Sequence, residues 1–368
     1  MRLLPISLLA LLLGVQSPAM RQQDLAVAGV GSPFYRIPAL TVTTRGTLLA
    51  AWDARPTLKD LPDPISVVIR RSTDGGATWG PQSVVRGADG PAGFGDPSFV
   101  VDRTTRRIFL FYAASVRQGF FGSATGNRHD DPDVQQADYS CSDDDGLTWT
   151  HRRITGAIKD PAWGGIFAAS GQGIQLRYGR YAGRLVQQYV VRRGKEVFAA
   201  SAYSDDHGDT WRMGALVGPG ADENKTVELS DGRLMLNSRA KPYRKVAFSS
   251  DGGATWTGWR DEPQLIDPAN NGAIVRLHPE APSGSAGARV LLFSNTESRD
   301  RRENIVVKQS CDDGATWTSR LVVEPGAASY STLATLPDGR VGILYERGTV
   351  SAIVFAAFDP ASLGPCGA

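Results

Sequence analysis

An eight-residue pattern, Ser-x-Asp-x-Gly-x-Thr-Trp, occurs five times in the chain and restricts the fold more than any other feature. Its copies start 45 to 70 residues apart, and together they hold five of the eight Trp residues. They are Ser72–Trp79, Ser142–Trp149, Ser204–Trp211, Ser249–Trp256 and Ser310–Trp317. An internal repeat at such a period indicates a chain built from one supersecondary unit used several times.

Each copy, here called an Asp box, predicts a β-hairpin turn. The Asp side chain can accept hydrogen bonds from backbone N–H groups of its own turn. The Gly permits the positive φ that a tight hairpin requires, and the Trp ring can pack against the sheet. A calcium loop is the alternative, because Asp-x-Asp-x-Gly is partly present. No Glu follows at the offset such a loop requires, so the structural turn is favoured.

The segments between the boxes also predict strands. Short apolar runs such as Ile108–Tyr112 and Val341–Tyr345 alternate with turns rich in Gly, Pro and Asp. About 340 residues at about 60 residues per repeat correspond to six units. Radial repetition of four-stranded sheets defines a β-propeller. We therefore predict an all-β, six-bladed β-propeller that occupies residues 29–368 as one domain.

The first 28 residues predict a signal peptide. Arg2 is followed by the apolar run Leu3–Val15, which is too short to cross a membrane as a helix of about 20 residues. A positive start followed by such a run is typical of a secretory signal. Small residues at Ser17–Ala19 and at Ala26–Ala28 leave two cleavage points open, after residue 19 or after residue 28. We expect a secreted, extracellular protein without a stable membrane anchor.

Composition excludes some classes of function. The chain has 40 Lys and Arg against 38 Asp and Glu, a net charge of +2, which argues against nucleic acid as a partner. The four His residues show no metal-ligand spacing, so we expect no metal and no cofactor. We expect a monomer.

A second motif, Tyr35-Arg36-Ile37-Pro38, precedes a predicted strand near the start of the propeller. Together with the five Asp boxes it resembles the sialidase (neuraminidase) superfamily, and secreted actinobacterial exo-sialidases in particular, over essentially all of residues 29–368. The resemblance implies a retaining exo-α-sialidase that releases terminal α-linked sialic acids from glycans, glycoproteins or gangliosides. The boxes alone carry no such implication, because other propellers contain them too.

The resemblance also assigns roles to residues. It implies an arginine triad that binds the substrate carboxylate, made of Arg36, Arg239 and a third member within Arg299–Arg302. Spacing back from Cys311 favours Arg302 over Arg299 and Arg301.

The other implied roles belong to single residues. Asp60 resembles the acid/base, Tyr330 the nucleophile and Glu223 its carboxylate partner. Glu346 resembles the residue that supports Arg36. Arg55 and Asp96 resemble pocket residues near the glycerol or N-acetyl region.

The chemistry of sialic acid explains this set. The sugar carries a carboxylate on its own anomeric carbon, and three guanidinium groups can bind it with charge-assisted hydrogen bonds. The same carboxylate would repel an Asp or Glu nucleophile, whereas a neutral Tyr deprotonated by Glu avoids this repulsion. Two alternatives remain. A trans-sialidase would differ in aromatic residues at an acceptor site, and a non-catalytic sialic-acid-binding propeller would lack Tyr330, Glu223 or Asp60.

The cysteines are too few for a disulfide scaffold. Cys311 lies in the fifth Asp box and Cys366 near the end of the chain. A disulfide between them would fasten the C-terminal segment in an oxidising compartment and leave Cys141 free.

Overall fold

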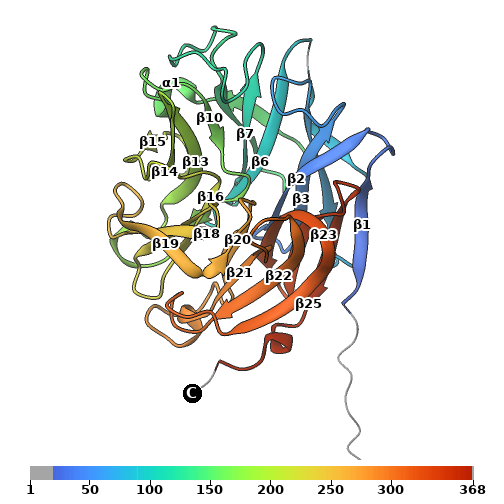
Figure 1. Cartoon of the computed structure of the whole chain (residues 1–368), viewed down its shortest axis with the longest axis vertical. Coiled ribbons are helices and arrows are strands. Elements are labelled where there is room, and N and C mark those ends of the chain that lie inside the picture. The colour runs from blue at the N-terminus through green and yellow to red at the C-terminus, as the bar shows by residue number, and fades with distance from the viewer. Residues whose placement is uncertain (1–19, 89, 367–368) are drawn as a thin grey trace, which may run out of the picture.

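The computed structural model describes residues 20–88 and 90–366, which form a ring of β-sheets (Figure 1). The expected leader lies mostly outside these residues. Consecutive blades follow one another around the ring, as the colours from blue to red show. Four sheets form one blade each, and a fifth, seven-stranded sheet forms two blades joined through the long strand β23. The prediction of a six-bladed β-propeller is therefore confirmed.

The first three blades contain residues 34–213. The first comprises β2 (Phe34–Val42), β3 (Leu48–Arg55), β4 (Ser66–Ser72) and β5 (Ser83–Arg86). The second comprises β6 (Gly93–Val101), β7 (Ile108–Ser115), β8 (Gln136–Ser142) and β9 (Thr150–Arg153), with β11 (Gly171–Gln172) parallel to β6. The third comprises β10 (Ile166–Ala168), β13 (Leu185–Arg193), β14 (Glu196–Ser204) and β15 (Arg212–Met213), with β12 (Ile174–Gln175) beside β13.

The other three blades complete the ring. The fourth comprises β16 (Asn224–Glu228), β17 (Leu234–Ser238), β18 (Tyr243–Ser249) and β19 (Thr257–Ile266). The fifth comprises β20 (Ala273–Arg276), β21 (Leu291–Thr296), β22 (Glu303–Ser310) and the first half of β23 (Ser319–Thr335). The sixth comprises the second half of β23, β24 (Val341–Arg347), β25 (Ala352–Phe358) and β1 (Gln22–Val27). Short helical segments are α1 (Thr155–Ile158) and 3₁₀ turns at Gly179–Tyr181, Gly287–Arg289 and Pro360–Leu363.

Every Asp box joins the third strand of a blade to the fourth, as the turn interpretation predicted. In the first box Ser72 Oγ donates to Asp74 Oδ1 at 2.8 Å, and the backbone N–H of Gly76 donates to Ser72 Oγ at 2.9 Å. The N–H of Thr78 donates to Asp74 Oδ1 at 2.9 Å. The other four boxes repeat these bonds. The Asp is thus used within its own turn, and the described residues contain no cluster of potential metal ligands.

The boxes also connect neighbouring blades. Gly76 has a φ of 84°, and a Cβ there would lie 2.4 Å from the ring of Phe355 in the sixth blade. Both the conformation and the close approach therefore require Gly. The Trp79 ring meets Phe355 edge-on with the ring centroids 5.1 Å apart. The first box thus packs across the junction at which the ring closes.

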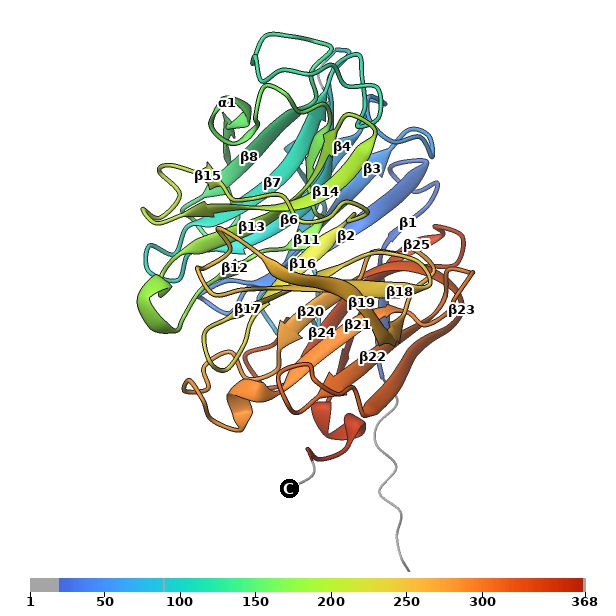
Figure 2. The same ribbon diagram turned by 60° about the vertical axis from the view of Figure 1, so that its left-hand side comes forward.

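The ring is closed by a strand from the N-terminal end of the chain. β1 pairs antiparallel with β25, so the fourth strand of the sixth blade is supplied by residues 22–27 (Figures 1 and 2). No hairpin has to connect the third and fourth strands of this blade. This explains why six blades carry five Asp boxes. It also places a propeller strand before residue 29, where we expected the domain to begin.

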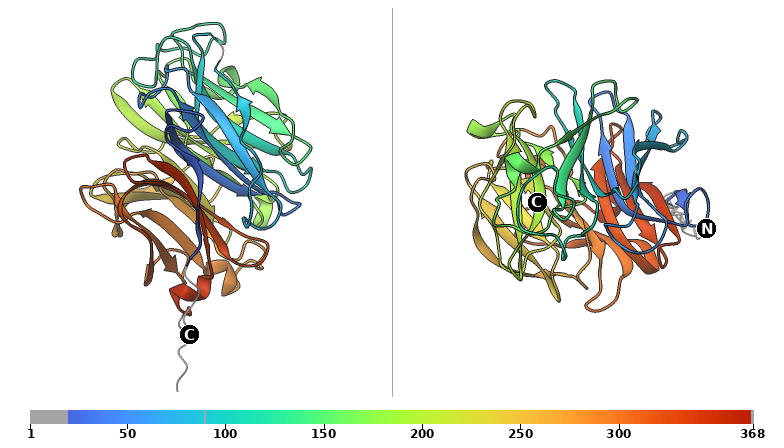
Figure 3. Two further views of the ribbon diagram at one scale, coloured as in Figure 1. Left: turned by 90° about the vertical axis from the view of Figure 1, so that its right-hand side faces the viewer. Right: turned by 90° about the horizontal axis from the view of Figure 1, so that it is seen from above.

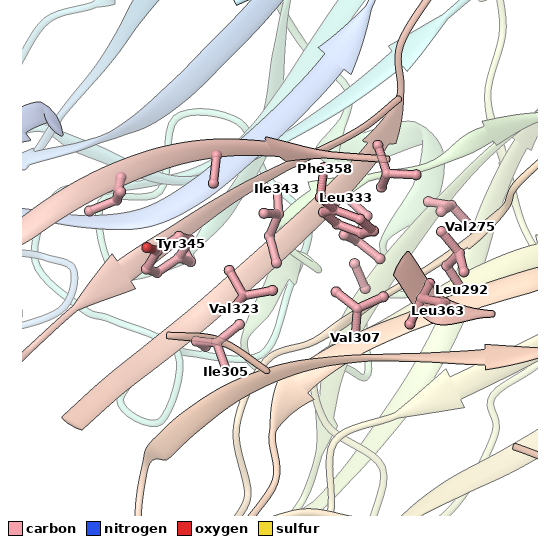
Figure 4. Close-up of a cluster of buried hydrophobic side chains, with 14 of the residues drawn as sticks. Val275, Leu292, Ile305, Val307, Val323, Leu333, Ile343, Tyr345, Phe358 and Leu363 are labelled. Carbon is pink, nitrogen blue, oxygen red and sulfur yellow. The ribbon is translucent and has the colours of Figure 1, made fainter. Parts of the chain in front are cut away.

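Apolar side chains fill the spaces between blades. Figure 4 shows one such cluster between the fifth and sixth blades, where Leu292 and Val307 lie near Leu333 and Ile343. The disulfide between Cys311 and Cys366, with Cα atoms 5.6 Å apart, fastens the C-terminal segment to the fifth blade. Cys141 is free, as expected, and it is buried. In the described part of the chain no helix is long and apolar enough to span a membrane. In the left-hand view of Figure 3 both ends of the described chain lie at the lower edge of the molecule.

Candidate active site

A cavity of about 540 Å³ receives residues from all six blades, which places it at the centre of the ring. Seven of the nine predicted site residues line it: Arg36, Asp60, Asp96, Glu223, Arg239, Arg302 and Tyr330. The inner strands of a propeller all face its axis, so residues far apart in sequence can meet there. The two remaining residues, Arg55 and Glu346, lie directly behind cavity residues.

Three arginines from different blades converge on Tyr330. Arg36 lies in β2, Arg239 directly follows β17, and Arg302 directly precedes β22. The guanidinium carbons of Arg36 and Arg302 lie 5.2 Å and 5.4 Å from the centroid of the Tyr330 ring. Nη1 of Arg239 donates to the Tyr330 hydroxyl oxygen at 2.7 Å. The three groups place three positive charges around the side chain of Tyr330.

The neighbours of Arg302 point elsewhere. Arg299 donates to the Tyr243 hydroxyl at 3.1 Å, and Arg301 is an exposed residue paired with Glu303. Neither lines the cavity, whereas Arg302 does. The structure therefore places in the cavity the arginine that the spacing favoured.

Glu346 supports Arg36 from behind. It is fully buried, and its Oε1 lies 3.4 Å from Nε of Arg36 and accepts the backbone N–H of Ile37 at 2.7 Å. Burial lowers the pKa of Arg36, but Glu346 and Tyr330 raise it more, so that its pKa lies above the ordinary value. Arg36 is thus a permanent cation with one face turned to the cavity.

Tyr330 and Glu223 have pKa values shifted in opposite directions. Burial and then Glu223 raise the pKa of Tyr330 well above its ordinary value. Burial raises the pKa of Glu223, but Arg239 and a hydrogen bond with Tyr330 outweigh burial and hold that pKa below its ordinary value. A neutral phenol therefore stands beside an ionised carboxylate. Such a divergence separates a proton donor from a base.

Asp60 lies at the mouth of the cavity and is held by a buried arginine. Its side chain is 80% exposed, and Oδ1 accepts from Nη1 of Arg55 at 2.7 Å. Arg55 also donates to Asp53 Oδ2 at 3.0 Å and 2.7 Å from Nε and Nη2. We expected Arg55 in the pocket wall, but the structure places it beneath Asp60, where the fork of its guanidinium joins the two carboxylates. Asp53 was not predicted; its only signal is the i, i+2 spacing that puts it on the same face of β3 as Arg55.

Breaks in strand register direct several of these side chains inward. Ile37 and Asp96 have φ values of 62° and 64°, each precedes a proline, and each lies at a bulge in an inner strand. A third bulge, between Ala328 and Ser331, contains Tyr330. A β-branched residue at positive φ is strained, and such strain is concentrated at functional sites. Bulges of this kind re-aim side chains next to a site.

Three phenylalanines also line the cavity. Phe120 packs edge-on against Phe121 and Phe167, with ring centroids 5.1 Å and 5.0 Å apart. Phe121 is 80% exposed at the rim. Its loop, between β7 and β8, carries no motif in the sequence, so this aromatic lining was not predicted.

Comparison with known proteins agrees with this architecture. Residues 46–343 match the model of the BNR repeat-like domain, so the chain belongs to this family. The sialidase of Micromonospora viridifaciens is 55% identical over 356 residues, which cover 94% of this chain and 55% of that protein. The chain therefore spans little more than half of this relative's length.

Solved structures agree as well. The Hadza microbial sialidase Hz136 matches with a TM-score of 0.83 at 32% identity, covering 90% of this chain and 67% of that one. An intramolecular trans-sialidase from Ruminococcus gnavus shares the fold, with a TM-score of 0.82 at 21% identity over 94% of this chain and 98% of that one. The chain belongs to the sialidase superfamily.

Proposed function

We propose that this protein is an exo-α-sialidase that hydrolyses terminal α-linked sialic acids of glycans, glycoproteins or gangliosides and retains the anomeric configuration. One observation carries the proposal: three guanidinium groups surround the side chain of Tyr330, and its hydroxyl lies beside an ionised, buried carboxylate. The 55% identity with a sialidase supports it.

The first half of the reaction uses Tyr330, Glu223 and Asp60. The arginines bind the sugar carboxylate and hold the anomeric carbon against the Tyr330 hydroxyl. Glu223 takes the phenolic proton as the tyrosine oxygen bonds to the anomeric carbon, and Asp60 gives a proton to the glycosidic oxygen as its bond breaks. The aglycone leaves with that proton, and the sugar remains bonded to Tyr330.

The second half reverses these transfers. Asp60, now a carboxylate, takes a proton from water as the water oxygen attacks the anomeric carbon. The bond to the Tyr330 oxygen breaks, and Glu223 returns the phenolic proton. Two displacements at one carbon give net retention.

The aspartate at the mouth suits this exchange of roles. Asp60 is exposed, so water and an aglycone can reach it, while Arg55 fixes the orientation of its carboxylate. The non-catalytic alternative is disfavoured because Tyr330, Glu223 and Asp60 are all present at one cavity.

We also propose that the protein is exported and that its signal is cleaved after residue 19. The expected alternative, cleavage after residue 28, would remove β1, the strand that closes the ring. N-terminal sequencing of mature protein from culture medium tests this proposal. A mature chain that starts at residue 29, or an intact Met1 in the cytoplasm, would contradict it.

Release of 4-methylumbelliferone from its α-sialoside by purified protein tests the enzymatic proposal. Tyr330→Phe, which keeps the ring and removes the nucleophilic oxygen, is the matched variant and should lose nearly all activity. Sialyllactose digested in the presence of a second acceptor separates hydrolysis from transfer. Free sialic acid as the main product supports the hydrolase, whereas sialylated acceptor or an anhydro sugar would support the trans-sialidase alternative.

A further inference from the structure

Lys225 is a buried cation that the proposed mechanism does not use. It lies in β16, two residues after Glu223, and is only 2% exposed. Its Nζ donates to Oδ1 of Asn271 at 3.0 Å and to the carbonyl of Asn224 at 3.3 Å. Among the described residues, no carboxylate lies within ion-pair distance of Nζ. Burying a charge without a paired counter-charge is costly, so a role for the amine is expected.

A chain of hydrogen bonds connects this amine to Glu223. Nδ2 of Asn271 donates to Oγ of Ser170 at 3.0 Å, and that Oγ donates to Oε1 of Glu223 at 3.4 Å. The four residues come from three blades and are each at most 2% exposed: Ser170, Glu223, Lys225 and Asn271.

The direction of the chain is fixed by chemistry. An ammonium can only donate, so the amide oxygen of Asn271 must face Lys225 and its amide nitrogen must face Ser170. Since Ser170 Oγ receives that N–H, its own proton is free to point at Glu223. Every donor is thus oriented toward the carboxylate, and hydrogen bonds aligned in this way polarise one another.

Lys225 carries its positive charge in the pH range in which Glu223 could become protonated. Burial lowers the pKa of Lys225 to about 7, although Glu223 raises it in part. The amine is therefore cationic below about pH 7, and only at acidic pH is the carboxylate at risk of protonation. The other charged or titratable groups around the two residues are Asp96, Asp222, Arg239, Arg244 and Tyr330.

We propose that Lys225 is a positioning residue that acts through Asn271 and Ser170 to keep Glu223 ionised and oriented at acidic pH. The proposal rests on the proposed hydrolase function. It extends that function by assigning the acidic limit of activity to a group that does not touch substrate.

The test is the pH profile of kcat/KM for the aryl sialoside, from about pH 4 to 8.5. The acid limb is the part of this profile in which kcat/KM falls as the pH is lowered. In Lys225→Met the acid limb should move up by roughly half to one pH unit, because a nearby positive charge lowers the pKa of a carboxylate by this amount or more. Relative to the wild type, kcat/KM should therefore fall roughly three- to tenfold at pH values within the acid limb. Near pH 8, where the native amine is neutral, it should hardly change. Ser170→Ala breaks the last link with the ammonium in place and should shift the limb the same way by less.

Lys159→Met is the matched control. Lys159 is also 2% exposed, and its Nζ lies 3.5 Å from the carbonyl oxygen of Gln135, outside the chain of hydrogen bonds. Its acid limb should stay in place.

Two results would overturn the proposal. One is an unmoved limb in folded Lys225→Met and Ser170→Ala; the other is an equal loss at every pH, which indicates packing alone. If Lys225→Met does not fold, the position of the acid limb in the pH profile of Ser170→Ala decides whether the proposal holds. An inactive wild-type protein would instead overturn the hydrolase function itself, and this is measured first.

Discussion

Nη1 of Arg239 lies 2.7 Å from the hydroxyl oxygen of Tyr330 and donates a hydrogen bond to it. The same nitrogen lies 2.5 Å from Oε2 of Glu223. One guanidinium nitrogen therefore bridges the proposed nucleophile and the proposed base. In the proposed mechanism Arg239 therefore has two roles: it stabilises the negative charge that passes between the two oxygens, and it contributes to binding of the substrate carboxylate.

Arg239→Lys keeps the charge and loses the planar fork. Each charge-assisted hydrogen bond contributes about 1.5–3 kcal/mol, so kcat/KM for the aryl sialoside should fall roughly ten- to hundredfold. Steady-state kinetics measure this. The control is Arg233→Lys, which should leave kcat/KM unchanged because Arg233 is exposed, directly precedes β17 and pairs with Asp231. Retention of full activity in Arg239→Lys would show that a positive charge at this position is enough for activity and that the planar fork is not required.

Arg302→Ala and Arg301→Ala should differ sharply. Arg302 lines the cavity, whereas Arg301 is exposed and pairs with Glu303. The first variant should bind the unsaturated analogue of sialic acid at least tenfold more weakly, because a charge-assisted contact is lost. The second should bind it as the wild type does. Calorimetric titration measures both, and equal affinities would remove Arg302 from the proposed triad.

Asp60→Ala should separate substrates by their leaving groups. General acid catalysis is typically worth 10²–10⁴-fold, so hydrolysis of sialyllactose should fall by about this factor. Aryl sialosides, whose leaving groups need little protonation, should lose much less. The ratio of the two losses is the measured quantity, and a ratio near one would indicate that Asp60 serves binding or folding.

The stability of the protein relative to Lys225→Met should rise with pH between about 7 and 10.5. Burial lowers the pKa of Lys225 from 10.5 in the unfolded chain to about 7 in the folded one. In this window the unfolded state binds more protons, so alkaline pH favours the folded state of the wild type. Lys225→Met has no amine at this position, so its free energy of unfolding lacks this pH-dependent contribution. Urea midpoints of both proteins at several pH values test the prediction, and parallel curves would contradict it.

Cys366→Ser should lower stability without changing the active site. The disulfide closes a loop with a sequence separation of 55 residues, for which chain entropy gives a stabilisation of about 4 kcal/mol. The melting temperature should fall by several degrees, while KM stays constant. Wild-type protein melted in the presence of reductant is the control and should match the variant. A wild type insensitive to reductant would show that the C-terminal segment is held by other contacts.

The β-propeller could be predicted from the sequence because the local turn signals and the internal repeat indicate the same fold. Asp74 and Gly76 specify a turn by themselves, and five such turns, separated by apolar runs that predict strands, indicate a propeller. Arg36 and Tyr330 were found because each lies in a motif that resembles a family. Their convergence follows from a ring in which every inner strand faces one axis.

The parts that were not predicted depend on contacts between distant segments. Arg55 has the same neighbours in sequence whether it faces the cavity or supports Asp60, and only the buried Asp53 decides between these positions. Phe121 stands at the rim because of the path of a long loop. The hydrogen bonds from Lys225 to Glu223 pass through Asn271 and Ser170, which lie in other blades, so no spacing along the chain could indicate them.

The pairing of β1 with β25 also has a consequence for how the chain folds. Gln22 lies opposite Ala356, so one of the contacts most distant in sequence is also the one that completes the last blade. Loop closure over such a span is entropically expensive, and it slows folding. During synthesis the N-terminal strand emerges first and must wait for nearly the whole chain before its partner exists. Until β1 docks, β25 is an open sheet edge, the kind of surface through which partly folded chains aggregate.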